Sequence, residues 1–233
     1  MMSHYLSFGL WLVGTAAMAV WTRHRGVSFC WGFVFGRGLV YYWSAKDGFP
    51  EFGGLLHQVW FGLGGWVMAY EVQRRLRRSG IACAPLTYFS TQSRDQWLRL
   101  LTAGLLCSGL AWGLTIELLV LPSGAMFADL QHWSVNLQQS PVVEYSLRMV
   151  GITFTAIGFV YFVVAADLEK YFCVVPLLGG FMGLVGVTLF GFGRGIEGLD
   201  ERGWIDGLCC LTLGIATVLL WLGCRARLRA WRN

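Results

Sequence analysis

The chain has 233 residues, of which 56% are hydrophobic and only 13% charged, and its net charge is +5. A soluble domain of this size carries about 25% charged residues, so this composition argues against a water-soluble protein. Twelve Trp, sixteen Phe and eight Tyr suit a protein that places aromatic rings at both membrane interfaces. We therefore predict an integral membrane protein, and we do not read the modest positive charge as a signal for nucleic acid.

Seven apolar segments are long enough to cross about 30 Å of hydrocarbon as helices with a 1.5 Å rise per residue. They are residues 5–22, 27–43, 53–72, 97–121, 141–166, 171–193 and 204–224. No positive charge precedes the first segment, and Arg23 and Arg25 follow it directly, so we expect a retained helix rather than a cleaved signal peptide. The prediction is an all-α, polytopic transmembrane helical bundle, with residues 1–233 as a single integral membrane domain.

The basic residues predict the orientation of this bundle, because cytoplasmic loops are enriched in Lys and Arg. With the N-terminus outside, the cytoplasmic side receives Arg23, Arg25, Arg74, Arg75, Arg77, Arg78, Arg94, Arg99, Lys170, Arg225, Arg227, Arg229 and Arg232. The outer side receives Lys46, Arg148, Arg194 and Arg202, while Arg37 lies within the membrane. We therefore expect the C-terminus in the cytoplasm, and a bacterial cytoplasmic (inner) membrane as the location.

The segment between Pro122 and Ser140 is the one long loop on the outer side. A short interfacial helix there would have an apolar side and a polar side. The apolar side would carry Phe127, Leu130, Trp133 and Leu137, and the polar side Gln131, Gln138 and Gln139. A plain solvated loop is the alternative. Ser140 and Pro141 form an N-cap followed by a Pro at the first helical position, which predicts that the fifth helix begins at Pro141.

Two stretches of the chain share an order of features. In each, a Gly-Arg-Gly sequence ends a helix, an Asp-Gly lies in the outward loop, and a helix then runs inward to a basic cluster. The matching residues are Gly36-Arg37-Gly38 with Asp47-Gly48, and Gly193-Arg194-Gly195 with Asp206-Gly207. This order predicts two parallel three-helix repeat units, 5–80 and 141–230, joined by a linking helix, 97–121; chance similarity between Gly-rich helices is the alternative.

The second half of the chain, about residues 97–224, resembles small DoxX-like membrane proteins of uncharacterised function. An Arg opens a Gly-rich helix (Arg148-Met149-Val150-Gly151), a short charged break follows (Asp167-Leu168-Glu169-Lys170-Tyr171), and an Asp-Gly leads into the last helix (Asp206-Gly207). The resemblance implies a helical fold and no activity, and the first 96 residues depart from the family's pattern.

Polar residues near the outer side form a candidate outer polar layer, and they are Arg37, Asp47, Glu51, His57, Glu117, Glu144, Arg148, Arg194, Glu197 and Asp206. Arg37 is the costliest of them, since a central Arg costs about 2.5–3.5 kcal/mol on insertion scales. Three readings of Arg37 stay open: it snorkels to the outer headgroups, it pairs with an acid, or it forms an anion or headgroup site with Arg194. Judged by depth, its nearest acids are Asp47, Glu51, Glu197 and Asp206.

The other members of this layer have structural interpretations. Glu144 and Arg148 lie four residues apart with the acid first, which favours an intrahelical ion pair. Glu117 is expected at the interface, with proton acceptance in transport as the alternative, and His57 is expected to be a hydrogen-bonded interface residue. Glycines spaced four apart, at 32 and 36 and at 179 and 183, favour close helix contacts.

No catalytic signature is present in the sequence. The two Lys residues, Lys46 and Lys170, are expected in loops, which argues against a retinal pigment, and at most one of the four His residues falls within a span, which argues against haem ligation between helices. The seven Cys show no C-x-x-C spacing. We therefore expect no enzyme activity, no cofactor and no metal.

Three functional classes are consistent with these residues. The first is a non-catalytic structural or accessory protein that packs with lipid or with partner subunits, or as a homo-oligomer. The second is a small-solute transporter or channel with a polar site near Arg37 and Arg194. The third is a quinone-linked membrane redox subunit, for which Cys209 and Cys210 are the main residues of interest.

Overall fold

The computed structural model describes residues 2–22, 24–47, 51–80, 96–132, 138–193 and 200–232, and these residues form helices and turns without any strand. The helices follow one another along the chain as α1 (Met2–Thr22), α2 (Arg25–Asp47), α3 (Glu51–Arg78), α5 (Gln96–Gly113), the 3-10 turn η1 (Leu114–Ile116), α6 (Glu117–Val120), α7 (Ser123–His132), α8 (Pro141–Ala166), α9 (Val175–Gly193) and α10 (Asp200–Arg232). The prediction of an all-α protein is confirmed for these residues.

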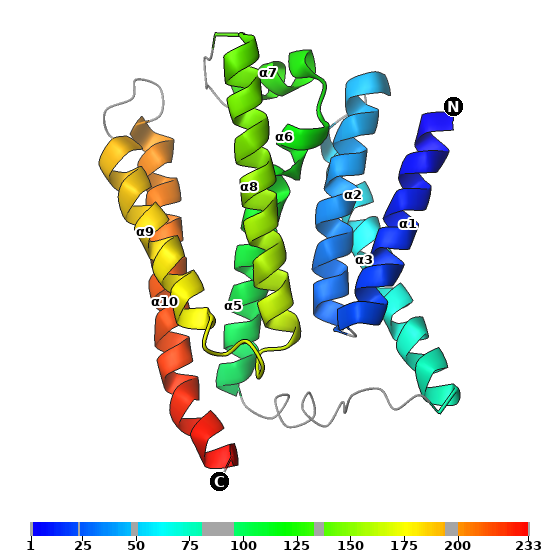
Figure 1. Cartoon of the computed structure of the whole chain (residues 1–233). Coiled ribbons are helices and arrows are strands. Elements are labelled where there is room, and N and C mark those ends of the chain that lie inside the picture. Colours follow the sequence, from blue (N-terminus) through cyan, green and yellow to red (C-terminus); the bar gives the residue numbers. More distant parts are fainter. Residues whose placement is uncertain are drawn as a thin grey trace.

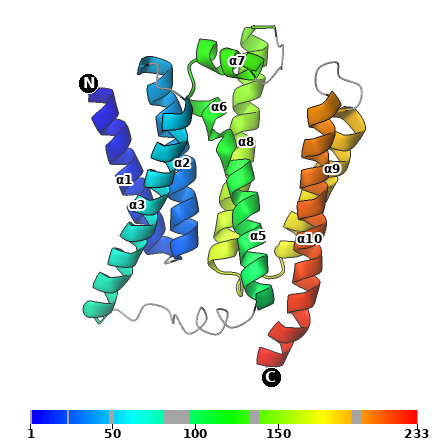
Figure 2. The ribbon, with the colours of Figure 1, turned by 180° about the vertical axis from the view of Figure 1, so that it is seen from behind.

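The long helices run alternately in opposite directions and form three groups (Figures 1 and 2). Helices α1, α2 and α3 pack on one another, α5 and α8 form the centre, and α9 and α10 form a hairpin that joins the centre mainly through α10 and α5. The N-terminus lies at the end of the bundle that also holds α7, and the C-terminus lies at the opposite end (Figure 1).

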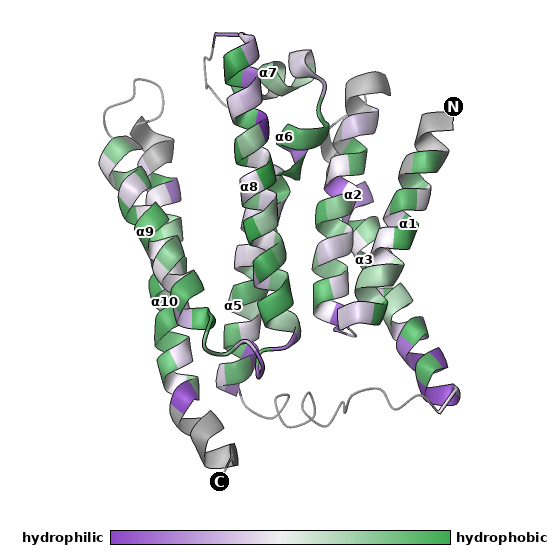
Figure 3. Cartoon of the chain, viewed as in Figure 1, coloured by the Kyte–Doolittle hydropathy of each residue, from purple (hydrophilic) through white to green (hydrophobic). Residues whose placement is uncertain are grey.

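Four helical stretches are long and apolar enough to cross a membrane: Gln96–Val120, Pro141–Ala166, Val175–Phe192 and Trp204–Arg225. The apolar part of α1, Phe8–Thr22, is shorter. Helices α2 and α3 have 23 and 28 residues, but Gly, Trp, Tyr and charged residues dilute their apolar character. Hydrophobic residues dominate the middle of the helices in Figure 3, whereas hydrophilic ones lie toward both ends and are most frequent at the lower end. The coarse expectation of a membrane-embedded helical protein therefore agrees with the structure.

Helix boundaries agree with the sequence where a capping residue marks them. Helix α8 begins at Pro141 as predicted, and the hydroxyl of Ser140 accepts a hydrogen bond from the amide of Val143 at 3.3 Å. Helix α9 begins at Val175 rather than at residue 171, because residues 167–174 form turns and Pro176 suits the first turn of a helix. The predicted helix over 97–121 is interrupted by the 3-10 turn before α6.

His24 caps the start of α2. Its Nδ1 accepts a hydrogen bond from the amide of Val27 at 3.1 Å, and its carbonyl accepts one from the amide of Ser28 at 3.0 Å. Burial in this position between α1 and α2 lowers the pKa of His24 from 6.5 to about 4. The ring is therefore neutral at pH 7, which is the state that can accept the hydrogen bond from Val27.

Glycines permit the closest helix contacts. A Cβ added at Gly214 of α10 would lie 2.5 Å from the amide nitrogen of Gly183 in α9, and one added at Gly158 of α8 would lie 2.6 Å from the amide nitrogen of Gly113 in α5. A Cβ added at Gly32 of α2 would lie 2.6 Å from a carbonyl oxygen of α3. Backbones touch in all three pairs, as small residues allow between helices in lipid.

The hydrophobic core lies where the three groups meet. Its fully buried members include Leu98, Leu101 and Leu105 of α5 and Tyr161 and Phe162 of α8. The Tyr161 hydroxyl also donates to the carbonyl of Leu178 in α9 at 3.0 Å, which attaches the hairpin to the centre. The first helices of the two predicted repeat units pack differently. Helix α1 packs on α2 and α3 of its own unit, whereas α8 lies mainly against α5, which is outside the second unit. The repeat stays a prediction.

Candidate functional site

Arg37 of α2 forms an ion pair with Glu117, the first residue of α6. The Nη2 and Nε atoms of Arg37 lie 2.6 and 2.7 Å from Oε2 of Glu117, and each side chain is about one-fifth exposed, at 20% and 19%. Two nitrogens of one guanidinium thus meet a single carboxylate oxygen. Glu117 thus neutralises the charge of Arg37, the residue for which the sequence predicts the highest cost of insertion into the membrane.

The break in the central helix places Glu117 at this position. A Cβ added at Gly113 would lie 3.0 Å from a methyl group of Val34, so α2 packs closely on the last turn of α5. One turn further on, a Cβ at Gly38 would contact Ile116 and Val120 at 3.6 and 3.7 Å. Glycines on both helices therefore bring α2 near enough to the 3-10 turn for Arg37 and Glu117 to meet.

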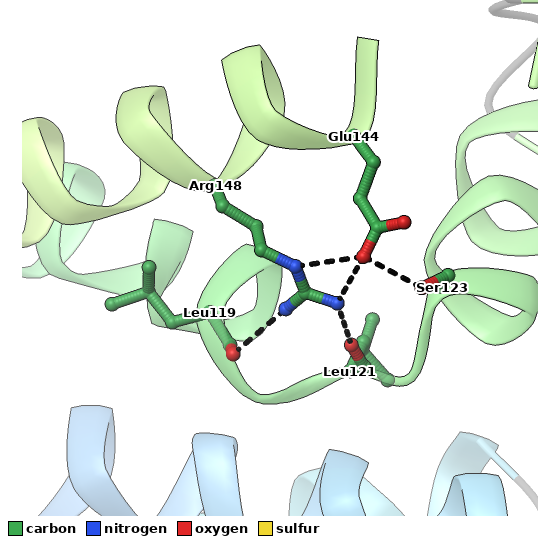
Figure 4. A network of polar contacts seen from close by, with 5 residues as sticks. All are labelled: Leu119, Leu121, Ser123, Glu144 and Arg148. Carbon is green, nitrogen blue, oxygen red and sulfur yellow. Dashed lines mark hydrogen bonds and ion pairs between the residues drawn. The ribbon is translucent and has the colours of Figure 1, made fainter. Parts of the chain in front are cut away.

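Glu144 and Arg148 of α8 form the expected intrahelical ion pair, and Arg148 also reaches the neighbouring segment (Figure 4). The Nη2 and Nε atoms of Arg148 lie 2.8 and 3.0 Å from Oε1 of Glu144. Its Nη1 donates to the carbonyl of Leu119 at 3.0 Å, and its Nη2 also donates to the carbonyl of Leu121 at 3.2 Å. Arg148 thus caps the carbonyl end of α6.

Ser123 completes this second cluster. Its hydroxyl donates to Oε1 of Glu144 at 2.6 Å, and Ser123 is the first residue of α7 (Figure 4). Beneath the polar contacts lies a small apolar cluster of Leu121, Met126 and Phe127, against which Leu130 and Val143 pack.

Of the two readings of the outer loop, a short helix or a solvated loop, the structure has a helix over 123–132, and Phe127 is buried while Gln131 is exposed. Trp133 and Leu137 lie outside the described residues.

The two clusters hold α6 at both ends. Glu117 anchors its first residue to α2, and Arg148 binds the carbonyls of its last residues from α8. The break is accompanied by Thr115, whose hydroxyl donates to the carbonyl of Trp112 at 2.7 Å, a local bond that is typical of bent helices. Polar side chains therefore hold both ends of the interruption in the central helix.

The predicted outer layer is only partly assembled in this way. Asp206, one of the acids judged nearest to Arg37 by depth, is exposed on α10, and α10 lies on the opposite flank of the central helices from α2 (Figures 1 and 2). His57 is exposed on α3. The side chains of Asp47 and Glu51, and the whole of Arg194 and Glu197, lie outside the described part of the structure, so their placement is untested.

Sequence reasoning missed the partner of Arg37 and the contacts of Arg148 outside its own helix. Glu117 was expected at the same depth as Arg37 but as an interfacial or proton-accepting residue. The signal that could have indicated its role is Pro122, which marks the end of the helix five residues later. No group of three or more His, Cys, Asp or Glu that could hold a metal ion occurs among the described residues.

Comparisons with protein-family models, with curated proteins and with solved structures find no match to this chain. The resemblance to DoxX-like membrane proteins therefore stays an expectation from the residues quoted for it.

Proposed function

We propose that the chain is a non-catalytic, multi-pass integral membrane protein that acts as a structural or accessory component. The observation that carries this proposal is the Arg37–Glu117 ion pair, in which the intramembrane Arg is matched by an acid of the same bundle. Charged residues that move a solute usually line a water-filled pathway. Here the contacts of Arg37 and Arg148 described above connect protein segments to one another, and this supports a role in holding the bundle together.

The distribution of charge supports insertion with the N-terminus outside and the C-terminus in the cytoplasm of a bacterial cell. At the lower end in Figure 1, the described side chains include eight basic and three acidic residues, a net charge of +5. They are Arg25, Arg74, Arg75, Arg77, Arg78, Arg99, Lys170 and Arg225, with Glu71, Asp167 and Glu169. The described charged side chains of the other end are Arg37 and Arg148 against Glu117, Glu144 and Asp206, a net charge of −1. Such asymmetry favours a cytoplasmic lower end.

In this proposal all seven long helices cross the bilayer, and α1, α2 and α3 do so as a packed unit. Helix α1 is the most apolar of the three, and close backbone contact between α2 and α3 shields the Gly-rich face of each. The partners are lipid and other membrane subunits or further copies of this chain, which would pack on the exposed apolar side chains of α3, α8, α9 and α10.

Two variants of the ion pair test this function. Arg37→Ala and Glu117→Ala should each lower the amount of folded protein in the membrane, because each leaves one charge uncompensated in the bundle. Arg74→Ala, which removes an exposed Arg from α3, is the matched control and should leave abundance unchanged. Permeability is measured in parallel on proteoliposomes, with chloride flux and glycerol swelling as probes.

The structural role predicts equal permeability for proteoliposomes containing equal amounts of wild-type protein and of either variant. Normal abundance of Arg37→Ala together with a changed chloride or glycerol flux would contradict it and would favour the transport class. A reporter fused after residue 233 tests the orientation separately, and an extracytoplasmic signal would overturn the proposed topology.

A further inference from the structure

Arg25 lies between two aromatic rings at the positively charged end of the bundle. Its guanidinium carbon is 4.7 Å from the ring centroid of Tyr70 and 5.8 Å from that of Trp66. Arg25 is the first residue of α2, whereas Trp66 and Tyr70 are four residues apart on α3 and are 42% and 46% exposed. The three side chains therefore form one cation–aromatic cluster on the surface, which we call the Arg25 cluster.

No carboxylate of the described residues neutralises Arg25. The acid nearest in sequence to the cluster is Glu71, which follows Tyr70 directly, and it is engaged by Arg74 and Arg75 at 3.5 and 3.1 Å. A guanidinium stacked on aromatic rings retains N–H groups in its own plane that can bind a phosphate. Within the described ranges, Arg25 therefore forms no ion pair, and its guanidinium N–H groups can donate hydrogen bonds to an anionic ligand.

The aromatic members of the cluster also carry unused donors. Among the described residues, neither the indole N–H of Trp66 nor the hydroxyl of Tyr70 has a hydrogen-bond partner. A comparison within the same chain is provided by Trp221, which lies 5.3 Å beneath Arg225, because its indole N–H donates to the carbonyl of Phe172 at 3.0 Å. The ring of Trp221 is therefore fixed by the protein, whereas Trp66 and Tyr70 are about half exposed and make no such hydrogen bond among the described residues.

The depth of the cluster suits a lipid headgroup. Arg25 and the C-terminal part of α3 lie at the lower end in Figure 1, where the described side chains have a net charge of +5. Tyr and Trp occupy the headgroup level of bilayers, and basic side chains at that level attract anionic lipids of the cytoplasmic leaflet. Leu63 and Val67, both exposed on α3, supply apolar surface for the acyl chains next to the cluster.

We propose that Arg25, Trp66 and Tyr70 form a binding site for an anionic phospholipid, with the guanidinium of Arg25 binding the phosphate and the two rings holding the guanidinium in place. This inference rests on the proposed membrane location. The ligand is a lipid of the leaflet, not free phosphate, since the donors lie beside the apolar surface of Leu63 and Val67, which an acyl chain would cover and free phosphate would not.

The test uses the full chain in detergent micelles, with dioctanoyl phosphatidylglycerol and dioctanoyl phosphatidylcholine as probes and native mass spectrometry to count bound lipid. Hydrogen bonds to charged groups contribute about 1.5–3 kcal/mol, so Arg25→Gln should weaken phosphatidylglycerol binding roughly tenfold or more. Arg25→Lys keeps the charge but loses the planar stacked fork, and it should also lose the preference for phosphatidylglycerol. Arg99→Gln and Arg99→Lys are matched controls at the same end and should change binding less than about fivefold.

Three results would overturn the proposal: equal loss of binding in the Arg25 and Arg99 variants, equal affinity of the wild type for the two lipids, or complete displacement of the lipid by millimolar inorganic phosphate. Tyr70→Leu provides a second route if Arg25→Gln does not fold, and it should weaken binding in the same direction. Carbonate extraction of membranes is carried out on every variant, because loss of membrane integration would refute the proposed function and not the lipid site alone.

Discussion

The Arg37–Glu117 pair offers a quantitative test of how this bundle is held together. The perturbation is a double-mutant cycle of Arg37→Met and Glu117→Gln, which removes each charge while keeping much of the side-chain volume. Removing one partner of a fully buried ion pair costs about 3–5 kcal/mol, because the other charge is left without compensation. Both side chains here are about one-fifth exposed, so solvent or headgroups relieve part of that cost.

We expect each single substitution to lower the free energy of unfolding by about 2–3 kcal/mol after this allowance. The double variant should lose less than the sum of the two, because no unpaired charge remains. Pairwise couplings between polar groups in a membrane protein average about 0.6 kcal/mol and reach about 1.7. A coupling of about 1–2 kcal/mol is therefore expected for a charge pair with two short contacts.

The assay is reversible unfolding in mixed micelles of increasing dodecyl sulfate content, followed by circular dichroism. Glu71 and Arg75 of α3 serve as the control pair, because they lie 3.1 Å apart but are 40% and 78% exposed. Their coupling should be below about 0.5 kcal/mol. A coupling between Arg37 and Glu117 no larger than that of the control pair would refute the reasoning, since it would mean that the contact does not stabilise the bundle.

Three further predictions concern other parts of the fold. Arg148→Ala removes the bonds to the carbonyls at the end of α6, so hydrogen exchange in α7 should accelerate, and unchanged exchange would show that the apolar cluster alone holds α7. Gly214→Ala should lower the unfolding free energy by about 2 kcal/mol or more because its Cβ meets the backbone of α9, whereas Gly180→Ala, with nothing within 4 Å, should be neutral or slightly stabilising in the same unfolding assay. The pKa of His24 is about 4 in the folded protein and 6.5 in the unfolded chain, so the contribution of neutral His24 to the free energy of unfolding is fully present above pH 6.5. As the pH falls from 6.5 to 4, the free energy of unfolding should decrease by about 3 kcal/mol. His24→Asn, which keeps a capping acceptor, should remove most of this pH dependence in thermal melts, and an unaltered dependence would assign it to other groups.

Features that depend on position along one helix could be predicted from the sequence. Ser140 and Pro141 fix the start of α8, and the spacing of Glu144 and Arg148 predicts their ion pair, because both depend only on local geometry. The contacts of Arg148 with the end of α6 could not be predicted in this way. They require the helix over 97–121 to end early and turn, and its apolar sequence continues through the 3-10 segment without a strong breaker before Pro122.

The pairing of Arg37 shows why depth alone does not identify a partner. Counting residues from the outer ends of the helices gives each polar group a height in the membrane, and several acids share the height of Arg37. Which of them it meets depends on the lateral order of the helices, and that order is set by packing at small residues. Gly38 and Gly113 lie on the faces where α2 and the central helix touch, so their positions select Glu117, whereas Asp206, on α10, is separated from α2 by the central helices.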